Sequence, residues 1–393
     1  MLPGGAAAVK HGRNLWSDSG AGGSGLLLNR PAASIPVCRP LLPPAASISR
    51  YIERIDESRR YANFAPLVLE LKRRLAEAKG LQETQLAVVS SGTQALMLAL
   101  RLLAPNGGLC MVPSWTFAAT PGAAHWAGLT PWFVDIDRDA WALTPALARE
   151  ALRSAPGPVS AVVPVSPFGA AVPCPEWDDF RDATGIPVVI DAAAAWDALE
   201  PGRAPAVVSL HATKALGVGE AGVVVSTDAA LIAQVEERGN FGLYGSRISQ
   251  SIGINGKLAE HTAAVGLAAL DEWPTRRLRW IDNACRYRAG IGDLVTFPPG
   301  FAEHAVATCV VQNPWTTAEE LGRELEAAGI GTLRWWQEAC HRHPAFAGMP
   351  RLPAPESERA AAMTLGLPMT PDLSIADIDY VVDAVRIVLG ADR

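Results

Sequence analysis

The sequence predicts an α/β protein built on a large, mostly parallel sheet with helices on both faces. Between residues 86 and 191, short apolar segments alternate with helical ones. The apolar segments are continuous rather than alternating with polar residues, which is typical of strands buried on both faces of a parallel sheet. The chain has 393 residues, 49% hydrophobic and 19% charged, which suits one large domain and a smaller one.

The strands and helices of this sheet follow from apolar runs separated by helical segments. Strands are predicted at 86–89, 109–112, 130–135, 161–165, 187–191, 206–210 and 222–226. The helices between them are predicted at 94–103, 118–126, 145–153 and 176–184. In open sheets of this kind the ligand lies beyond the carboxyl ends of the strands. The turns that follow the strands are therefore where chemical groups are expected.

The segments before the first strand differ in character. Residues 1–35 are rich in Gly, Ala and Ser and lack hydrophobic periodicity, so we expect a flexible leader or a misplaced start. Four prolines make residues 36–44 an extended arm. Helices are expected next at 47–58 and at 66–77, and the second is clearly amphipathic.

The last third of the chain predicts a smaller α+β domain, with residues 36–275 forming the large domain and 276–393 the small one. Helices are expected at 255–273, 276–288, 317–328 and 375–389, and strands at 293–297 and 305–311. Arg334, Trp335 and Trp336 lie in a loop of this domain, where they either contact a substrate or only pack.

Composition excludes several classes of protein. The net charge is −6 and no basic stripe is present, which argues against a nucleic-acid partner. The six cysteines show no paired spacing, and Cys110 and Cys309 lie in apolar runs, as expected of buried thiols in a reducing cytoplasm. No apolar run is long enough to span a membrane, and the amino terminus lacks the apolar region of a secretory signal. We therefore expect a cytoplasmic protein with no membrane partner.

Three turns after strands carry groups that could act together. Ser90-Ser-Gly-Thr93 opens a helix, where free N–H groups and hydroxyls suit an anion, although taken alone the turn is better explained as an ordinary helix cap. Asp191 closes a buried strand and needs a cationic or hydrogen-bonding partner, which could be purely structural. Lys214 lies between two apolar strands, five residues after Ser209. Burial would lower the pKa of Lys214 and make its neutral amine a nucleophile or base.

Their joint occurrence favours one cofactor. A phosphate needs N–H and O–H donors, a pyridine nitrogen needs an anion to stay protonated, and an aldehyde needs an amine for a Schiff base. A phosphate cradle, a carboxylate and a lysine in that order on such a sheet match the requirements of pyridoxal phosphate.

From about Pro36 to Leu389 the chain resembles the DegT/DnrJ/EryC1/StrS family of pyridoxal-phosphate-dependent sugar aminotransferases. The stretches that match in the family's order are 61–67, 90–96, 113–120, 133–137, 190–193, 209–214 with 219–222, 253–258, 367–373 and 377–383. The resemblance implies fold type I, with a large α/β/α domain and a smaller C-terminal α+β domain. It also implies a homodimer with shared active sites.

The resemblance assigns roles to individual positions. Lys214 would form the Schiff base and then act as the base that moves a proton. Asp191 would hold the pyridinium N–H. Phe117 would stack on the pyridine ring; simple core packing is the other interpretation, and the two are compatible. Asn255 would reach the phosphate of the neighbouring subunit. The remaining cofactor ligands, all at the phosphate, would be Gly92, Thr93 and Ser209.

Two stretches depart from the family pattern. Ala194 stands where the family usually has Gln or His, so the site binds a different substrate, uses Trp196 or another residue, or is slower. The turn Val165-Ser-Pro-Phe-Gly169 lacks the family's usual histidine. A branch of the family that dehydrates sugars has His in place of the lysine, and Lys214 argues against that branch.

Three other features are interpreted without a role in the chemistry. Gly217-Val-Gly-Glu-Ala-Gly222 has dinucleotide-motif spacing but precedes a strand, so we interpret it as a tight return. Cys340-His-Arg-His343 fits no standard zinc site, and we expect a solvated loop and no metal. For His211 a structural hydrogen bond is at least as plausible as a cofactor contact.

The resulting functional hypothesis is a transaminase. An amino acid, glutamate in our prediction, would donate the amino group to a keto sugar carried on a nucleotide, for a surface polysaccharide or a glycosylated metabolite. The alternatives are a transaminase of another cyclic ketone and a catalytically idle homologue that binds the cofactor for regulation. Ala194 is the feature that favours the last of these.

Overall fold

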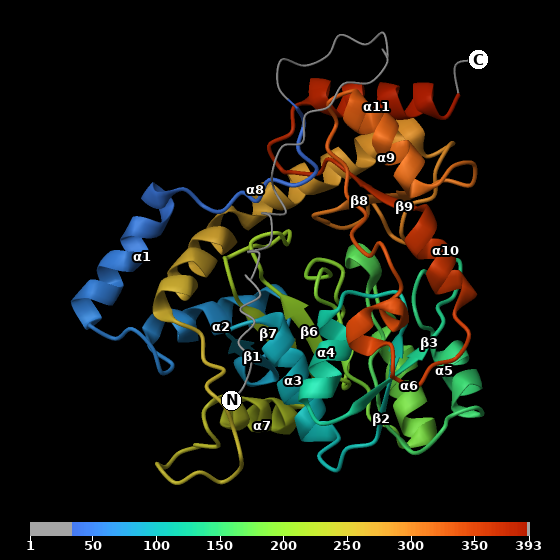
Figure 1. The fold of residues 1–393 in the computed structure, drawn as a ribbon. Helices are drawn as coiled ribbons and strands as arrows, with labels where there is room; N and C mark the ends of the chain where they lie inside the picture. Colours follow the sequence, from blue (N-terminus) through green and yellow to red (C-terminus); the bar gives the residue numbers. More distant parts are fainter. Residues whose placement is uncertain (1–33, 391–393) are drawn as a thin grey trace, which may run out of the picture.

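A computed structural model describes residues 34–390, and its centre is a seven-stranded sheet (Figure 1). The strands are β1 (Leu86–Val89), β2 (Leu109–Pro113), β3 (Thr130–Val134), β4 (Val159–Val162), β5 (Ile190–Asp191), β6 (Ala206–Ser209) and β7 (Gly222–Val225). They pair as β1-β7-β6-β5 and β3-β2-β4, and parallel bridges from Val162 to Val188 and from Val165 to Asp191 join the two groups. Only β7 runs antiparallel to its neighbours, so the predicted mostly parallel sheet is confirmed.

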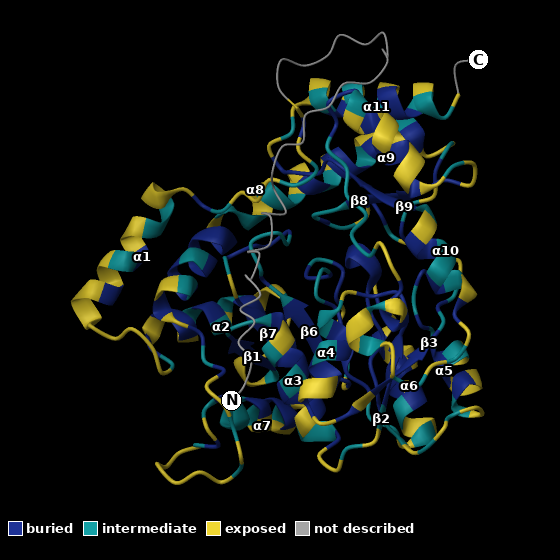
Figure 2. Ribbon diagram, in the orientation of Figure 1, coloured by how far each residue is buried: buried dark blue, intermediate teal, exposed yellow. Residues whose placement is uncertain are grey.

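Helices cover both faces of this sheet because successive strand residues point to opposite sides. In β1, Leu86 and Val88 face one hydrophobic cluster while Ala87 and Val89 face another. The first cluster takes in α2 (Pro66–Ala78), α5 (Pro145–Leu152), α6 (Cys174–Thr184) and the start of α8 (Glu260–Ile291). The second takes in α3 (Gly92–Leu103), α4 (Ala119–Trp126) and α7 (Ala229–Gly239). Figure 2 shows the strands buried between these layers.

A second, smaller unit follows the large one and has its own hydrophobic cluster. Its elements are the antiparallel pair β8 (Cys309–Gln312) and β9 (Thr364–Leu367), with α9 (Ala318–Ala327), α10 (Pro355–Met363), α11 (Ile375–Val388) and the second half of α8. The arm before α1 (Ala45–Ser58) joins it, because the N–H of Ile35 donates to Gly329 O and the N–H of Gly331 donates to Ile35 O. The predicted leader, residues 1–35, lies almost wholly outside the described residues.

Two predictions for this region are wrong. The helices expected at 255–273 and 276–288 are one helix, α8, which begins at Glu260 and continues through Pro274. Pro274 costs the helix one backbone hydrogen bond. The helix continues because each half is packed into a hydrophobic cluster, the first half up to Leu270 and the second half from Trp280. The predicted boundary at residue 275 therefore falls inside a helix.

The strand expected at 293–297 is absent from the described structure. Only Thr296 pairs there, in an isolated bridge to Gln312. Val295 is buried in the small cluster and Asp293 pairs with Arg386 of α11, so the apolar residues serve packing rather than a ladder. The strand expected at 305–311 is shorter and later, at Cys309–Gln312.

Candidate active site

Lys214 lies in a tight loop between β6 and β7. Backbone bonds close the loop: the N–H of Val218 donates to Leu210 O at 2.9 Å, and that of Ala212 donates to Gly219 O at 2.8 Å. The N–H of Lys214 donates to His211 O at 2.9 Å. His211 itself bonds Thr213 through Nδ1 at 2.8 Å, which agrees with a structural role for this histidine. The loop therefore holds the backbone of Lys214 in one place.

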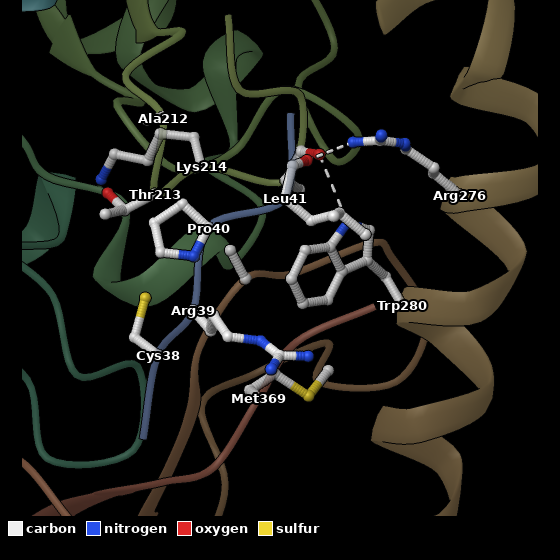
Figure 3. A pocket seen from close by; sticks show the side chains of 12 residues that line it. Cys38, Arg39, Pro40, Leu41, Ala212, Thr213, Lys214, Arg276, Trp280 and Met369 are labelled. Carbon is white, nitrogen blue, oxygen red and sulfur yellow. Dashed lines mark hydrogen bonds between the residues drawn. The ribbon is translucent and has the colours of Figure 1, made fainter. Parts of the chain in front are cut away.

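The pocket beside Lys214 is lined by five separate parts of the chain: the arm, the lysine loop, α8, Ala307 and Met369 (Figure 3). The arm supplies Cys38 to Leu41 and passes between the lysine loop and α8. From α8, Arg276 donates to the carbonyl of Leu41, and Trp280 Nε1 donates to Ala215 O at 3.3 Å. Burial lowers the pKa of Lys214, and the charges of Asp191 and Cys38 offset this only in part. Burial therefore shifts Lys214 toward the neutral amine that a nucleophilic lysine requires.

Asp191 ends β5 and is 5% exposed. Its carboxylate accepts the hydroxyl of Thr120 at 2.7 Å and the N–H of Ala193 at 3.1 Å. Because Thr120 gives its only hydroxyl hydrogen to Asp191, it accepts from Thr116, whose hydroxyl oxygen lies 2.9 Å away. Burial nevertheless raises the pKa of Asp191 above its usual value. A protonated ring nitrogen at this carboxylate would supply the positive charge that burial makes favourable.

The turns after β1 and β6 meet where a phosphate is predicted. A Cβ added to Gly92 would lie 3.0 Å from the Cβ of Ser209. A Cβ added to Gly222, at the start of β7, would lie 2.5 Å from Gly92 N and from the carbonyl of Ser91. Ser91 caps α3 by accepting the N–H of Gln94, and Thr93 is exposed in the first turn. Gly92, Thr93 and Ser209 therefore surround the amino end of a 12-residue helix, whose dipole favours an anion.

Phe117 stands in the turn between β2 and α4 with 63% of its surface exposed. Packing in the core, the alternative considered for this side chain, is therefore wrong. The turn is closed by the N–H of Thr120, which donates to Phe117 O at 3.1 Å. An exposed aromatic ring next to Thr120, the partner of Asp191, is available to a flat ligand.

Asn255 is exposed in the loop between α7 and α8 and bridges Asn240 through its backbone. Its neighbour Gly256 accepts the N–H of Ser90 at 2.9 Å, which ties the loop to the turn after β1. The stretch between Asn240 and Asn255 carries side chains that are large, apolar and exposed: Phe241, Tyr244, Ile248, Ile252 and Ile254.

Three other residues were candidates for contacts with the substrate: Trp196, Arg334 and Trp336. Trp196 is buried in the core under the ammonium of Lys79, 5.0 Å from its ring centroid, so it does not replace the side chain missing at Ala194. Trp336 stacks on Phe168 with ring centroids 4.3 Å apart, and Arg334 donates to Ala361 O at 3.0 Å. For this loop the packing alternative is therefore the better description.

Two features were missed or misjudged from the sequence. Thr120 carries the hydrogen bond to Asp191, and no local pattern separates it from an ordinary helix residue. Cys340 and His341 are buried, so the expected solvated loop is wrong. Within residues 34–390, no group of three His, Cys, Asp or Glu side chains could hold a metal ion. In the same range no helix is both long and apolar enough to cross a membrane.

Comparison with known proteins agrees with this arrangement. The sequence model of the DegT/DnrJ/EryC1/StrS aminotransferase family matches residues 45–386. The chain belongs to this family. The resemblance found in the sequence is thereby confirmed, and so is the predicted enzyme class, an aminotransferase.

Among relatives, the dTDP-3-amino-3,4,6-trideoxy-alpha-D-glucose transaminase of Streptomyces venezuelae is 33% identical over 355 residues, with 85% of this chain and 90% of that protein covered. Protein Rv3402c of Mycobacterium tuberculosis is 30% identical, with 82% of each covered. The solved structure of DesI in the presence of its TDP-sugar product matches with a TM-score of 0.80 at 30% identity, over 91% of this chain and 93% of that one. Fold type I and its cofactor, pyridoxal phosphate, are those of the family and its structural neighbours.

The close approach at Gly222 gives a first testable prediction. Gly222→Ala should lower the free energy of unfolding by roughly 1–3 kcal/mol, because the new methyl group meets backbone that has to move. Gly122→Ala is the matched control, since nothing lies within 4 Å of a Cβ at Gly122 in α4. The control should be neutral or up to about 1 kcal/mol more stable. Equal denaturant midpoints for the two variants would contradict the contact.

Asp191 gives a second prediction, on the cofactor-free chain. Because burial raises the pKa of Asp191 above 3.8, the folded chain holds a proton that the unfolded chain releases. The contribution of Asp191 to stability is therefore lost as pH rises through its folded pKa. Asp191→Asn should raise the thermal midpoint relative to the natural chain, by an amount that grows as the pH rises above about 4 and levels off above the folded pKa of Asp191. The exposed Asp139→Asn variant controls for net charge, and a gap that stays constant with pH would refute the prediction.

Proposed function

We propose that this chain is a pyridoxal-phosphate-dependent aminotransferase that moves an amino group from an amino acid, glutamate in our prediction, to a keto sugar carried on a nucleotide. The observation that carries the proposal is the meeting of Lys214, Asp191 and the amino end of α3 at the carboxyl edge of one sheet. The sugar-nucleotide substrate is supported by the names of the relatives, which include a dTDP-sugar transaminase.

The residues fit this cofactor. Asp191 would accept the ring N–H, Gly92, Thr93 and Ser209 would hold the phosphate, and the exposed ring of Phe117 would cover one face of the pyridine. When bound, the cofactor supplies an aldehyde and an electron-withdrawing ring. Thr120 and Thr116 keep the carboxylate of Asp191 oriented.

Lys214 would carry the proton transfers. Burial shifts its amine toward the neutral form, in which Nζ can attack a carbonyl carbon. The same Nζ can then take a proton from the carbon that bears the amino group and return it elsewhere. The closed backbone of the lysine loop limits how far Nζ moves between these steps.

A second copy of the chain would complete each site. The exposed apolar side chains of the 241–254 loop need cover, and Ile252 is 93% exposed. A symmetric partner that buries this loop would bring Asn255 to the phosphate of the other subunit. The role in surface polysaccharide or glycosylated metabolites and the cytoplasmic location stay predictions.

The central test uses Lys214→Ala. The natural chain should turn yellow with pyridoxal phosphate, and glutamate should shift the absorption band to that of the amine form. Lys214→Ala should lose the band and lower transamination by at least about 100-fold, because no other amine replaces Nζ. Lys72→Ala, which removes a lysine of α2 paired with Glu236 of α7, should keep both the band and the activity.

Two outcomes would contradict the proposal in different ways. A natural chain that never takes up pyridoxal phosphate would refute the cofactor. A yellow protein that ignores every amino donor would favour the idle homologue suggested by Ala194.

The shared site gives a further prediction. Mixed and refolded together, Lys214→Ala and Asn255→Ala chains should form hybrid dimers with one intact site, because each chain supplies what the other lacks. Random mixing would restore about a quarter of the natural activity, above either variant alone. Adding Ile252→Asp to both chains should abolish the rescue, with light scattering showing monomers. Rescue that never exceeds the sum of the separate variants would mean that each subunit builds its own site.

A further inference from the structure

Residues 336–342 hold the turn that carries Phe117. The N–H of Cys340 donates to Ser114 O at 2.7 Å, and its thiol lies 3.2 Å from Thr116 O. On the other side, Trp115 Nε1 donates to Trp336 O at 3.2 Å. Three consecutive residues of the turn, 114 to 116, are therefore fixed by a segment more than 200 residues away.

His341 adds a bond that depends on its protonation state. Its Nδ1 lies 2.6 Å from the hydroxyl of Ser114, which has 0% exposure, and its Nε2 lies 3.2 Å from Oε1 of Glu358 in α10. An ionised carboxylate only accepts, so Nε2 carries the hydrogen and Nδ1 accepts the hydrogen of Ser114.

The surroundings of the ring favour this neutral form. Burial lowers the pKa of His341, and the charges of Arg351 and Arg342 lower it further, against the opposing effect of Glu358. Arg342 also holds Glu358 through Nη2 at 2.6 Å. Both ring nitrogens are therefore committed to protein groups, and His341 does not present a free nitrogen to a substrate.

We propose that His341 is a positioning residue for the cofactor, because its bond to Ser114 fixes the turn that orients Phe117 and leads to Thr120. This role rests on the proposed function, in which Phe117 covers the pyridine ring. Other bonds to Cys340, Trp336 and Thr120 also hold the turn, but within the described residues the bond to His341 is the one that satisfies the buried hydroxyl of Ser114. Without an acceptor the Ser114 hydroxyl would be buried and unsatisfied, which would favour a rearranged turn.

Two substitutions separate the bonds of His341. Asn places an amide oxygen near the position of Nδ1, so His341→Asn can keep the bond to Ser114. Gln reaches the position of Nε2, so His341→Gln can keep the bond to Glu358 but leaves Ser114 without an acceptor. A bulk packing role would make the two variants alike, whereas positioning through Ser114 predicts that they differ.

The full-length chain loaded with pyridoxal phosphate gives the readouts. We expect His341→Gln to weaken cofactor affinity about tenfold, the size of one lost hydrogen bond, and to reduce the visible circular dichroism of the bound ring. His341→Asn should stay within about threefold of the natural chain. Ser114→Ala should resemble His341→Gln, and combining the two should add little. Arg323→Ala, which removes an exposed side chain of α9 paired with Glu319, is the control and should keep the affinity and the dichroism. Thermal unfolding of each variant checks that the fold is retained.

The outcomes distinguish this role from the proposed function. If the natural chain gives no cofactor signal, the proposed function fails and this role fails with it. If the natural chain binds the cofactor and His341→Gln keeps its affinity and dichroism, only the role of His341 is overturned. Equal losses in the Asn and Gln variants would likewise overturn it, in favour of simple packing.

Discussion

The buried carboxylate of Asp191 is the constraint on which the site depends. It closes a strand in the middle of the sheet and has two hydrogen-bond donors but no salt bridge in the described structure. Burial pushes the pKa of Asp191 up and that of Lys214 down, so each group is driven toward its neutral form even though their charges attract. A ligand with a protonated nitrogen for one group and an electrophilic carbon for the other resolves both costs at once. The two buried groups therefore favour binding of such a ligand and lower the stability of the ligand-free chain.

Close backbone packing places the other parts around this pair. Because Gly222 has no side chain, the start of β7 approaches the Ser91–Gly92 turn and brings the amino end of α3 to Ser209. Gly169 also permits a close approach of main chain, because an added Cβ would lie 2.9 Å from Ala194 O and 3.0 Å from a methyl group of Val306. The wall at Ala194 is therefore made of main chain and an apolar side chain of the C-terminal part.

The local sequence pattern predicted those helices and strands that pack into a single hydrophobic cluster. The continuous apolar strands of the central sheet were predicted within a few residues, and Lys214, Asp191 and the Gly92 turn could be found because each follows a strand. The failures share a different cause. In α8 one helix serves two clusters, so Pro274 and a change of buried face looked like a break between helices. At 293–297 and 340–343, and at Thr120, the environment is set by residues distant in sequence, which periodicity does not encode.

The C-terminal part of the chain contributes residues to the surroundings of the site. Trp280 and Met369 line the pocket at Lys214, Val306 closes the side at Ala194, and residues 336–342 hold the turn before α4. Each of these residues or segments contacts a different turn at the carboxyl edge of the sheet. The arm at Cys38 lies between the lysine loop and α8. A shift of the small unit would therefore move the surroundings of the lysine, the Ala194 wall and the Phe117 turn together. The relative position of the two units is thus a property of the site itself, and α8, which runs through both cores, is the element best placed to maintain it.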